Sequence, residues 1–404
     1  MIRRIRRFVL YAGSFFVSAC LHCASFLGRR KRILFLCQSP LMAEHLRPYW
    51  LLLSGDKRLS FWVCFEAAAS LYPDSEITRM KELLPLRSCK CLFAPLLTPR
   101  LIITADHSSA LSFFFPFFTP ALYVGHGAEG KVLAGSNQSY AYGMSAYVRG
   151  RLSYALMFEY SETNKKLAIE GDPNLASFIK VIGSVQHDEL IAAQASRKVF
   201  RRALKLCEED IALLVLITWG PNSLLEVLGE EFVHEAARLT DKFKFFFALH
   251  PNEFRTKSDG NPGWGMRLQS QQYPGLRFRE ISESLIPYMI ASDIVISDHT
   301  SLVQSAVLLR KPVIVSPVPG EFMRKGSVTA ELFGFAPMLS QARDLEAVLG
   351  QAYFSYPAES LNDLANSMHS FPSQALNNAK DAIYSLLRLP PFSRAIRSGE
   401  FKYN

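Results

Sequence analysis

Short apolar segments alternate with helical segments along the chain after residue 32, and this alternation constrains the fold more than any other feature. A first series of expected strands comprises Ile33–Cys37, Phe61–Phe65, Leu101–Thr104, Leu122–Gly125, Leu156–Tyr160 and Ile179–Ile182. A second series comprises Ile211–Thr218, Phe243–His250, Ile294–Ser297 and Val313–Ser316. Nearly continuous apolar strands must be buried on both faces, so strands that alternate with helices indicate parallel sheets covered by helices on both sides.

Two such series in 404 residues predict an α/β protein with two doubly wound, Rossmann-like domains. We assign residues 33–190 to the N-terminal domain and residues 191–387 to the C-terminal domain. Residues 1–32 form a separate element, and residues 388–404 form a tail. The polar segment 257–275, which is rich in Gly, Pro, Asn, Ser and Gln, is expected to be a loop.

The positive charge of the chain is concentrated at its N-terminus. Residues 1–32 contain eight Arg or Lys and no Asp or Glu, whereas the whole chain has 45 basic and 36 acidic residues and a net charge of +9. The rest is nearly neutral, which argues against a basic surface for nucleic acid. Residues 8–27 are apolar-leaning and flanked by basic clusters, so we expect residues 1–32 to anchor the protein to an anionic membrane surface.

Three interpretations of residues 8–27 stay open. They can form a membrane-associated helix that spans the bilayer or lies in one leaflet, a secretory signal peptide, or a helix packed on the first domain. The seven cysteines are odd in number and several, such as Cys37, lie in apolar segments. That pattern is typical of buried thiols in a reducing compartment. We therefore expect the domains to lie on the cytoplasmic side of the cell inner membrane.

The first polar motif, GHGAEGK at residues 125–131, directly follows an expected strand. Its Gly and Lys spacing is that of a phosphate-binding loop, but Val132 stands where such a loop has the Ser or Thr that holds Mg²⁺. His126 lies at the carboxyl end of the strand, which is where open α/β sheets bind ligands. It can act there as a general base, and the alternative is a structural histidine in a tight turn.

Two further motifs follow strands of the second series. Pro251 ends the strand FKFFFAL, so that His250 also lies at a carboxyl edge. The segment 297–301, SDHTS, lies between the strand DIVI and an apolar helix. Its polar side chains can cap the helix or, with the helix start, bind a phosphate group. Glu283 precedes another helix and can cap it or bind a ribose. The chain has no Asp-x-Asp pair, so no Mg²⁺ site, and more generally no metal or cofactor, is expected.

These motifs, in this order, resemble those of the CDP-glycerol glycerophosphotransferase family, the teichoic-acid polymerases and primases. His126-Gly127-Ala128-Glu129-Gly130-Lys131 is similar to the family's H-G-x-x-x-K element, and His250-Pro251 to its His-Pro after a strand. Residues 297–301 and Lys311-Pro312-Val313-Ile314 are similar to its S/T-D-Y-S-S and K-P-x-I elements. Ile182-Gly183-Ser184 with Asp188 is similar to its hinge, and Thr218-Trp219 to a strand end. The resemblance covers roughly residues 120–335.

The resemblance implies a GT-B architecture, with an acceptor domain and a nucleotide-donor domain facing across a cleft. It implies that a hydroxyl of a lipid-linked or polymeric acceptor attacks the β-phosphorus of CDP-glycerol or a similar CDP-alditol and releases CMP. His126 would take the hydroxyl proton, and His250 would neutralise the charge that grows on the leaving CMP. The donor diphosphate would be held by Ser297, Asp298, Thr300, Ser301 and Lys131, and the nucleoside positioned by Gly127, Glu283 and Thr218. Asp298 would also hold this loop or orient a histidine.

Two other functions remain open. The same two-domain frame hosts glycosyltransferases that use a nucleotide sugar, for example in capsule or lipopolysaccharide synthesis, and fold alone does not separate them from the phosphotransferases. A non-enzymatic membrane scaffold with this fold is the third hypothesis, and it predicts that the two histidines are dispensable.

Overall fold

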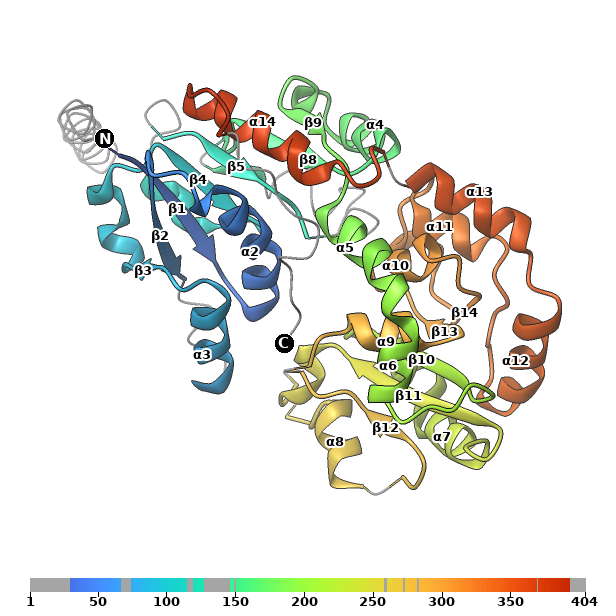
Figure 1. Cartoon of the computed structure of the whole chain (residues 1–404). Coiled ribbons are helices and arrows are strands. Elements are labelled where there is room, and N and C mark those ends of the chain that lie inside the picture. Colours follow the sequence, from blue (N-terminus) through green and yellow to red (C-terminus); the bar gives the residue numbers. More distant parts are fainter. Residues whose placement is uncertain are drawn as a thin grey trace, which may run out of the picture. The chain divides into compact units, whose positions relative to one another are not determined.

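The computed structural model of the protein describes residues 30–66, 74–114, 119–126, 146–148, 150–257, 260–271, 273–281, 283–368 and 370–392. These residues form two compact α/β units (Figure 1). Unit 1 contains the described residues of 1–126, 141–185 and 371–404, and unit 2 contains residues 186–370. Among the described residues, no helix combines the length and apolarity needed to cross a membrane. The apolar segment 8–27 lies outside them.

Unit 1 is built around a parallel sheet of seven strands in the order β3-β2-β1-β4-β5-β8-β9. The strands are β1 (Lys31–Cys37), β2 (Leu59–Phe65), β3 (Arg87–Ser88), β4 (Leu101–Thr104), β5 (Ala121–Tyr123), β8 (Leu156–Glu159) and β9 (Ile179–Val181). A separate antiparallel pair consists of β6 (Tyr147–Val148) and β7 (Arg151–Leu152). The helices are α2 (Pro40–Ser54), α3 (Asp74–Leu83), α4 (Glu162–Gly171) and α14 (Ala375–Leu387), with short 3₁₀ turns η2 (Cys91–Leu97), η3 (Ser109–Phe113) and η5 (Pro173–Leu175).

The side chains of β1 show how the sheet of unit 1 is buried on both faces. Successive strand residues point to opposite faces. Ile33 and Phe35 contribute to a core that includes residues of α2 and α14, whereas Leu34 and Leu36 contribute to a core that includes residues of η2 and η3. All four side chains are fully buried. The continuous apolar sequence of β1 is therefore explained by burial on both sides.

Unit 2 is built around a parallel sheet of five strands in the order β12-β11-β10-β13-β14. The strands are β10 (Ile211–Ile217), β11 (Phe243–Leu249), β12 (Arg277–Phe278), β13 (Ile294–Ser297) and β14 (Val313–Val315). The longer helices are α5 (Val185–Ala193), which begins at the end of unit 1, α6 (Arg197–Ala203), α7 (Leu224–Arg238), α8 (Trp264–Ser270), α12 (Leu345–Phe354) and α13 (Ala358–Met368). Three six-residue helices complete it: α9 (Ile286–Ala291), α10 (Val303–Leu308) and α11 (Val328–Phe333).

The ten predicted strands are all present, with ends shifted by at most two residues. The prediction of a loop over residues 257–275 was wrong in part, because α8 occupies Trp264–Ser270. Trp264 is buried, and its indole Nε1–H donates to Glu226 of α7 at 2.8 Å. The guanidinium of Arg267 lies 3.9 Å from the Trp264 ring centroid. These tertiary contacts order a segment whose composition is that of a loop.

The C-terminal helix α14 belongs to unit 1, although the sequence led us to place residues up to 387 in the second domain. In Figure 1 it is the red helix that returns to the blue and cyan elements. The Tyr384 hydroxyl donates to Asp56 at 2.9 Å, and the Asn378 amide donates to the carbonyl of Ile182 at 3.0 Å. The alanines on one face of α14 allow it to pack closely against unit 1, which a linear domain assignment cannot reveal.

The last residues of the predicted N-terminal anchor are part of the fold. Lys31 and Arg32 lie in β1, where the Lys31 ammonium group donates to the carbonyl of Leu387. The Arg32 guanidinium donates to the carbonyl of Leu97 at 2.8 Å. The boundary between the expected anchor and unit 1 therefore lies before residue 31.

Candidate functional site

Each unit has the strand order that defines a Rossmann-type sheet, with a reversal of direction next to its first strand. In unit 1 the chain adds β2 and β3 on one side of β1, and then β4 and β5 on the other. In unit 2 it adds β11 and β12 on one side of β10, and then β13 and β14 on the other. Open α/β sheets bind ligands outside the carboxyl ends of the strands at such switch points. The residues that follow these strands are therefore the candidates for a site in each unit.

In unit 1 a titratable group or its hydrogen-bond partner follows each central strand. We call this cluster the unit 1 edge, and its residues are Gln38 after β1, Glu66 after β2, Asp106 and His107 after β4, His126 after β5, and His45 on α2. The Gln38 amide donates to Glu66 at 2.8 Å and to the Thr104 hydroxyl at 3.4 Å, so its bonds cross the switch point between β1 and β4. The predicted general base His126 thus stands among acidic and basic side chains.

The hydrogen bond of His126 fixes its neutral tautomer. Its Nδ1 lies 2.9 Å from the backbone carbonyl of Ala105. A carbonyl can only accept, so Nδ1 carries the proton and Nε2 keeps its lone pair in the neutral ring. The Asp106 carboxylate lies 3.9 Å from the same Nδ1.

His45 is a second histidine of the unit 1 edge. Its ring and the His126 ring make an edge-on contact, with centroids 6.4 Å apart. Burial, followed by repulsion from His126, lowers the pKa of His45 to about 3. Its Nδ1 is buried and has no hydrogen-bond partner among the described residues. His45 therefore remains neutral beside the candidate base at ordinary pH.

Glu66 is the acidic residue of the unit 1 edge whose pKa is raised. Burial raises its pKa, and the negative charge of Asp106 raises it further, whereas hydrogen bonds from Ser108 and Gln38 oppose the shift. His107 stacks on Tyr123, with ring centroids 5.0 Å apart, and its Nδ1 lies 3.0 Å from the Tyr154 hydroxyl. Shifted carboxyl and imidazole groups at a strand edge mark a candidate site.

In unit 2 a single buried carboxylate holds the switch point together. The side chain of Asp298 is fully buried, and it accepts three backbone hydrogen bonds. Its Oδ2 accepts from Thr218 N at 2.9 Å and from Leu224 N at 3.0 Å, and its Oδ1 accepts from Thr300 N at 3.0 Å. Asp298 thereby joins the end of β13 to the end of β10 and to the start of α7. Of the roles expected for Asp298, these partners fit that of holding the loop.

The other predicted phosphate ligands are buried to different extents. Ser297 is fully buried, and its hydroxyl donates to the carbonyl of Leu216 at 3.4 Å. Thr300 is buried, and its hydroxyl accepts from Leu302 N at 3.4 Å. Ser301 is only half-buried. The helix α10 begins at Val303 with Leu302 at its N-cap, so Thr300 and Ser301 do not occupy the capping position that we predicted.

Two hydroxyls that the sequence analysis missed lie at the same edge. Ser223 is the N-cap residue of α7, and Ser316 directly follows β14. Both side chains are fully buried, and neither hydroxyl has a hydrogen-bond partner among the described residues. Because buried hydroxyls normally have partners, each of these two is unusual at this edge of the sheet. We call the group of Thr218, Ser223, His250, Asp298, Ser301 and Ser316 the unit 2 edge.

His250 has the opposite tautomer to His126. It follows β11, and its Nδ1 accepts a hydrogen bond from Asn252 N at 3.1 Å at the start of η7 (Pro251–Phe254). A backbone N–H can only donate, so the neutral ring carries its proton on Nε2. The ring lies near the half-exposed indole of Trp219, with centroids 6.0 Å apart. His250 therefore offers a neutral N–H donor at the carboxyl edge.

The remaining predicted residues have structural partners or lie outside the described chain. Thr218 is buried, and its backbone is bound to Asp298. The Glu283 carboxylate accepts from Glu280 N at 3.1 Å and from the Tyr288 hydroxyl at 2.7 Å. It does not cap α9, because the Ser284 hydroxyl accepts from Ile286 N there at 3.3 Å. Gly127 and Lys131 lie outside the described residues.

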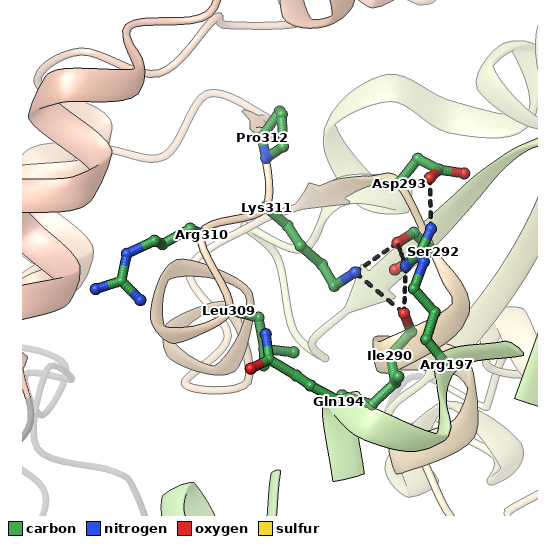
Figure 2. Close-up of a pocket in the computed structure, with 9 residues that line it drawn as sticks. All are labelled: Gln194, Arg197, Ile290, Ser292, Asp293, Leu309, Arg310, Lys311 and Pro312. Carbon is green, nitrogen blue, oxygen red and sulfur yellow. Dashed lines mark hydrogen bonds and ion pairs between the residues drawn. The ribbon is translucent and has the colours of Figure 1, made fainter. Parts of the chain in front are cut away.

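A pocket of about 290 Å³ lies at the opposite edge of the unit 2 sheet, before β13 and β14. Figure 2 shows Lys311 and Arg197 pointing toward the last carbonyls of α9. Lys311 donates to the carbonyls of Ile290 and Ser292, and Arg197 donates to Ser292 O at 2.8 Å and to Asp293 at 2.6 Å. These donors satisfy the last carbonyl groups of α9. The Lys-Pro motif of the sequence is therefore structural, and it does not belong to the unit 2 edge.

The signal that could have revealed the missed residues is their position after predicted strands. Gln38 and Glu66 directly follow segments that we identified as strands, and Asp106 follows a third by one residue. His45 gives no such signal, because it approaches from a helix. Within the described residues, no group of three or more His, Cys, Asp or Glu side chains has an arrangement that could hold a metal ion.

Comparison with known proteins supports the fold but no family. No protein-family profile matches the sequence, and no curated protein is similar to it in sequence. A solved structure of the wall teichoic acid polymerase TagF matches with a TM-score of 0.62 and 11% identity, covering 96% of this chain and 98% of that one. The UDP-GlcNAc 2-epimerase from Neisseria meningitidis bound to UDP-GlcNAc matches with a TM-score of 0.55 and 16% identity, covering 88% of this chain and 100% of that one.

A third match is the structure of MnaA from S. aureus with UDP, with a TM-score of 0.58 and 13% identity, covering 89% of this chain and 98% of that one. Because the similarity extends over both units, the protein has the GT-B fold, with two parallel-sheet α/β units. At these identities the similarity establishes the fold alone.

Proposed function

We propose that the protein transfers glycerol phosphate, or a similar alditol phosphate, from a CDP-activated donor to a hydroxyl of a cell-surface polymer or lipid-linked acceptor, with release of CMP. One observation carries this proposal. The two histidines that the sequence motifs single out lie at the carboxyl edges of separate Rossmann-type sheets, and their hydrogen bonds give them opposite tautomers. One is built to accept a proton and the other to donate a hydrogen bond.

The unit 1 edge supplies the base. The lone pair on His126 Nε2 takes the proton of the acceptor hydroxyl while the hydroxyl oxygen attacks the β-phosphorus. The P–O bond to CMP breaks as the new phosphodiester bond forms, and the bonding electrons leave with CMP. The Asp106 carboxylate, 3.9 Å from His126 Nδ1, stabilises the imidazolium that results.

The unit 2 edge supplies groups that stabilise negative charge on the donor. The Nε2–H of His250 donates to an oxygen of the diphosphate, and its effect increases as charge accumulates on the leaving CMP. The hydroxyl of Ser301, which is half-buried, donates to a further oxygen. Asp298 contributes indirectly, because its three backbone hydrogen bonds hold the loops that carry these groups. His250 acts as a neutral donor, since protonation of its Nδ1 would break its bond to Asn252.

The TagF structures add support from the fold. They include a variant soaked with CDPG, which matches with a TM-score of 0.61 over 96% of this chain. A second candidate is a glycosyltransferase that uses a nucleotide sugar. The structures with UDP-GlcNAc and with UDP share the fold over 88% and 89% of this chain, so a nucleotide-sugar donor is compatible with it as well. The two candidates differ in the bond that is cut, P–O in the first and C–O in the second.

A donor screen on the purified full chain separates the candidates. We would measure thermal stabilisation and nucleotide release with CDP-glycerol, CDP-ribitol, UDP-, GDP- and CMP-sugars. A ligand that binds the folded state raises the melting temperature. We expect stabilisation by CDP-alditols, with CMP released in the presence of an acceptor. Stabilisation by a UDP- or GDP-sugar alone would favour the glycosyltransferase, and no response to any donor would favour a scaffold.

We also propose that residues 1–29 hold the enzyme at the cytoplasmic face of the inner membrane, where a lipid-linked acceptor lies. Deletion of these residues leaves β1 intact, because it begins at Lys31. The truncated protein should move from the membrane fraction to the soluble fraction and keep its thermal stability. A truncated protein that stays in the membrane fraction would contradict the anchor.

A further inference from the structure

Three cysteines of unit 1 converge on one face of the sheet, and the proposed reaction uses none of them. Cys64 lies in β2, Cys89 directly follows β3, and Cys91 begins η2. The Sγ atoms of Cys64 and Cys91 are 2.7 Å apart. Cys64 is fully buried, whereas Cys89 and Cys91 are half-buried. The cluster therefore combines a shielded thiol with two that solvent can reach.

The register of the sheet explains why these thiols meet. Val63 of β2 pairs with Ser88 of β3, and Cys89 N donates to Val63 O at 2.9 Å. Cys64 and Cys89 thus occupy the next position on neighbouring parallel strands, where side chains point to the same face. The chain then turns into η2, and this turn brings Cys91 over Cys64. The arrangement follows from the fold, and it joins residues 27 positions apart in the sequence.

We propose that Cys64 and Cys91 form a reversible disulfide by exchange with a low-molecular-weight disulfide, with Cys89 as the thiol that reacts first. This inference is independent of the proposed transferase function. The Cys64–Cys91 pair is the expected end product, because its Sγ atoms lie 2.7 Å apart. A Cys64–Cys89 disulfide is expected only as a transient intermediate.

The hydrogen bonds of the cluster distinguish the three thiols. The hydrogen bond from Cys64 lowers the pKa of Cys89, against the effect of its partial burial. The hydrogen bond to Cys89 and burial both raise the pKa of Cys64, and burial raises that of Cys91. Because the thiolate is the nucleophile, Cys89 has the highest share of the reactive form and is accessible to the oxidant.

The exchange proceeds in three balanced steps. The Cys89 thiolate attacks one sulfur of the disulfide RSSR, forms a mixed disulfide and releases RS⁻. Cys64, after losing its proton, attacks Cys89 Sγ and releases a second RS⁻. Cys91 then attacks Cys64 Sγ and returns Cys89 to the thiolate form. Overall, two thiols of the protein are oxidised and one RSSR is reduced to two RSH.

The test uses the full chain, fully reduced and then incubated with oxidised glutathione. Non-reducing peptide mapping should find Cys64 linked to Cys91, and dithiothreitol should reverse the link. Two other cysteines serve as internal controls. Cys207 is exposed and should carry glutathione, whereas Cys37 is fully buried, with its pKa raised to about 12 by burial, and should stay reduced. The disulfide closes the segment 64–91, so oxidation should raise the melting temperature by roughly 5–10 °C.

Variants separate the roles of the three thiols. Cys89→Ser should slow formation of the Cys64–Cys91 link at least tenfold without abolishing it, and Cys91→Ser should abolish it. The proposal is overturned if Cys207 becomes glutathionylated while residues 64 and 91 stay unlinked. A final link between Cys64 and Cys89, or a metal ion found on the three thiols by native mass spectrometry, would overturn it equally.

Discussion

The unit 1 edge and the unit 2 edge both lie at the carboxyl ends of the strands of a Rossmann-type sheet. They differ in how deeply their carboxyl groups are buried. At the unit 1 edge, the side chains of Glu66, Asp106 and His126 are half-buried, so solvent can reach their titratable groups. At the unit 2 edge the carboxylate of Asp298 is fully buried and is saturated by three backbone N–H groups. The fold provides the location, and burial decides whether a carboxyl group there stays open to solvent or is held by the backbone.

This difference sets out what each edge would contribute to the proposed transfer. A group that moves protons needs a pKa within reach of neutral pH and an accessible atom. A site that stabilises an anion needs donors held in place, and it gains nothing from further exposed carboxylates. The three predictions below test this comparison, from the largest expected effect to the smallest.

Removal of each histidine should have the largest effect. His126→Ala should lower the rate of CMP release from CDP-glycerol by about 10²–10⁴-fold, as expected for the loss of a general base. His250→Ala should lower it by about 10²–10³-fold, as expected for the loss of one donor to a developing anion. His234→Ala, at an exposed position on α7, is the matched control. If either variant keeps turnover within twofold of the wild type, the role assigned to that edge is wrong.

The two edge carboxylates should differ in their contribution to stability. Asp298→Asn places an amide N–H₂ against backbone N–H groups in a buried site, and it should lower the free energy of unfolding by about 2–5 kcal/mol. Asp106→Asn removes the same charge from a half-buried position and retains an acceptor for His107 N, so it should cost less than about 1 kcal/mol. Urea denaturation measures both. Equal losses in the two variants would remove the distinction between the edges.

The charge of Lys311, at the opposite edge of unit 2, should give the smallest effect, visible as a dependence on pH. Burial lowers its pKa to about 7, and repulsion from Arg197 adds to the shift while Asp293 opposes it. The unfolded chain binds this proton up to about pH 10.5, so between these values unfolding takes up a proton and stability rises with pH. The slope is at most about 1.4 kcal/mol per pH unit.

The measurement compares the wild type with Lys311→Met. The free energy of unfolding of the wild type minus that of the variant should increase by about 1–2 kcal/mol between pH 7 and pH 9. Lys325→Met, at an exposed position, should give a difference that does not change with pH. A flat difference for Lys311→Met would mean that its ammonium group is solvated in both states.

The sheets and their order of elements were accessible from the sequence, because burial on both faces leaves continuous apolar segments. Short strands at the edges of the sheets could not be predicted from the sequence. Arg277 and Phe278 of β12 carry no apolar run, and they are a strand only because Phe247 of β11 offers a partner at the edge of the sheet. The helix α8 was missed for a similar reason, since the contacts of Trp264 order a segment of loop-like composition.

Half of the candidate site was visible in the same way. His126, His250 and the segment 297–301 stand in recognisable motifs after strands, and the sequence identifies them. It cannot assign their tautomers, because these depend on the Ala105 carbonyl and on Asn252 N. Nor can it show that the Asp298 carboxylate accepts hydrogen bonds from three backbone N–H groups, since Thr218 and Leu224 are 80 and 74 positions away in the chain.

By itself, the sequence determined the fold class, the positions of the longer strands and the histidines at their ends. These features depend on the local pattern of apolar residues and on the residues that end each strand. Both can be recognised within a few consecutive positions. Only the tertiary structure shows that α14 packs against unit 1 and that Lys311 donates to the carbonyls at the end of α9. It also brings Cys64 against Cys91, 27 positions away. Each of these depends on which surfaces come together when the strands pair, and that pairing links residues far apart in the chain.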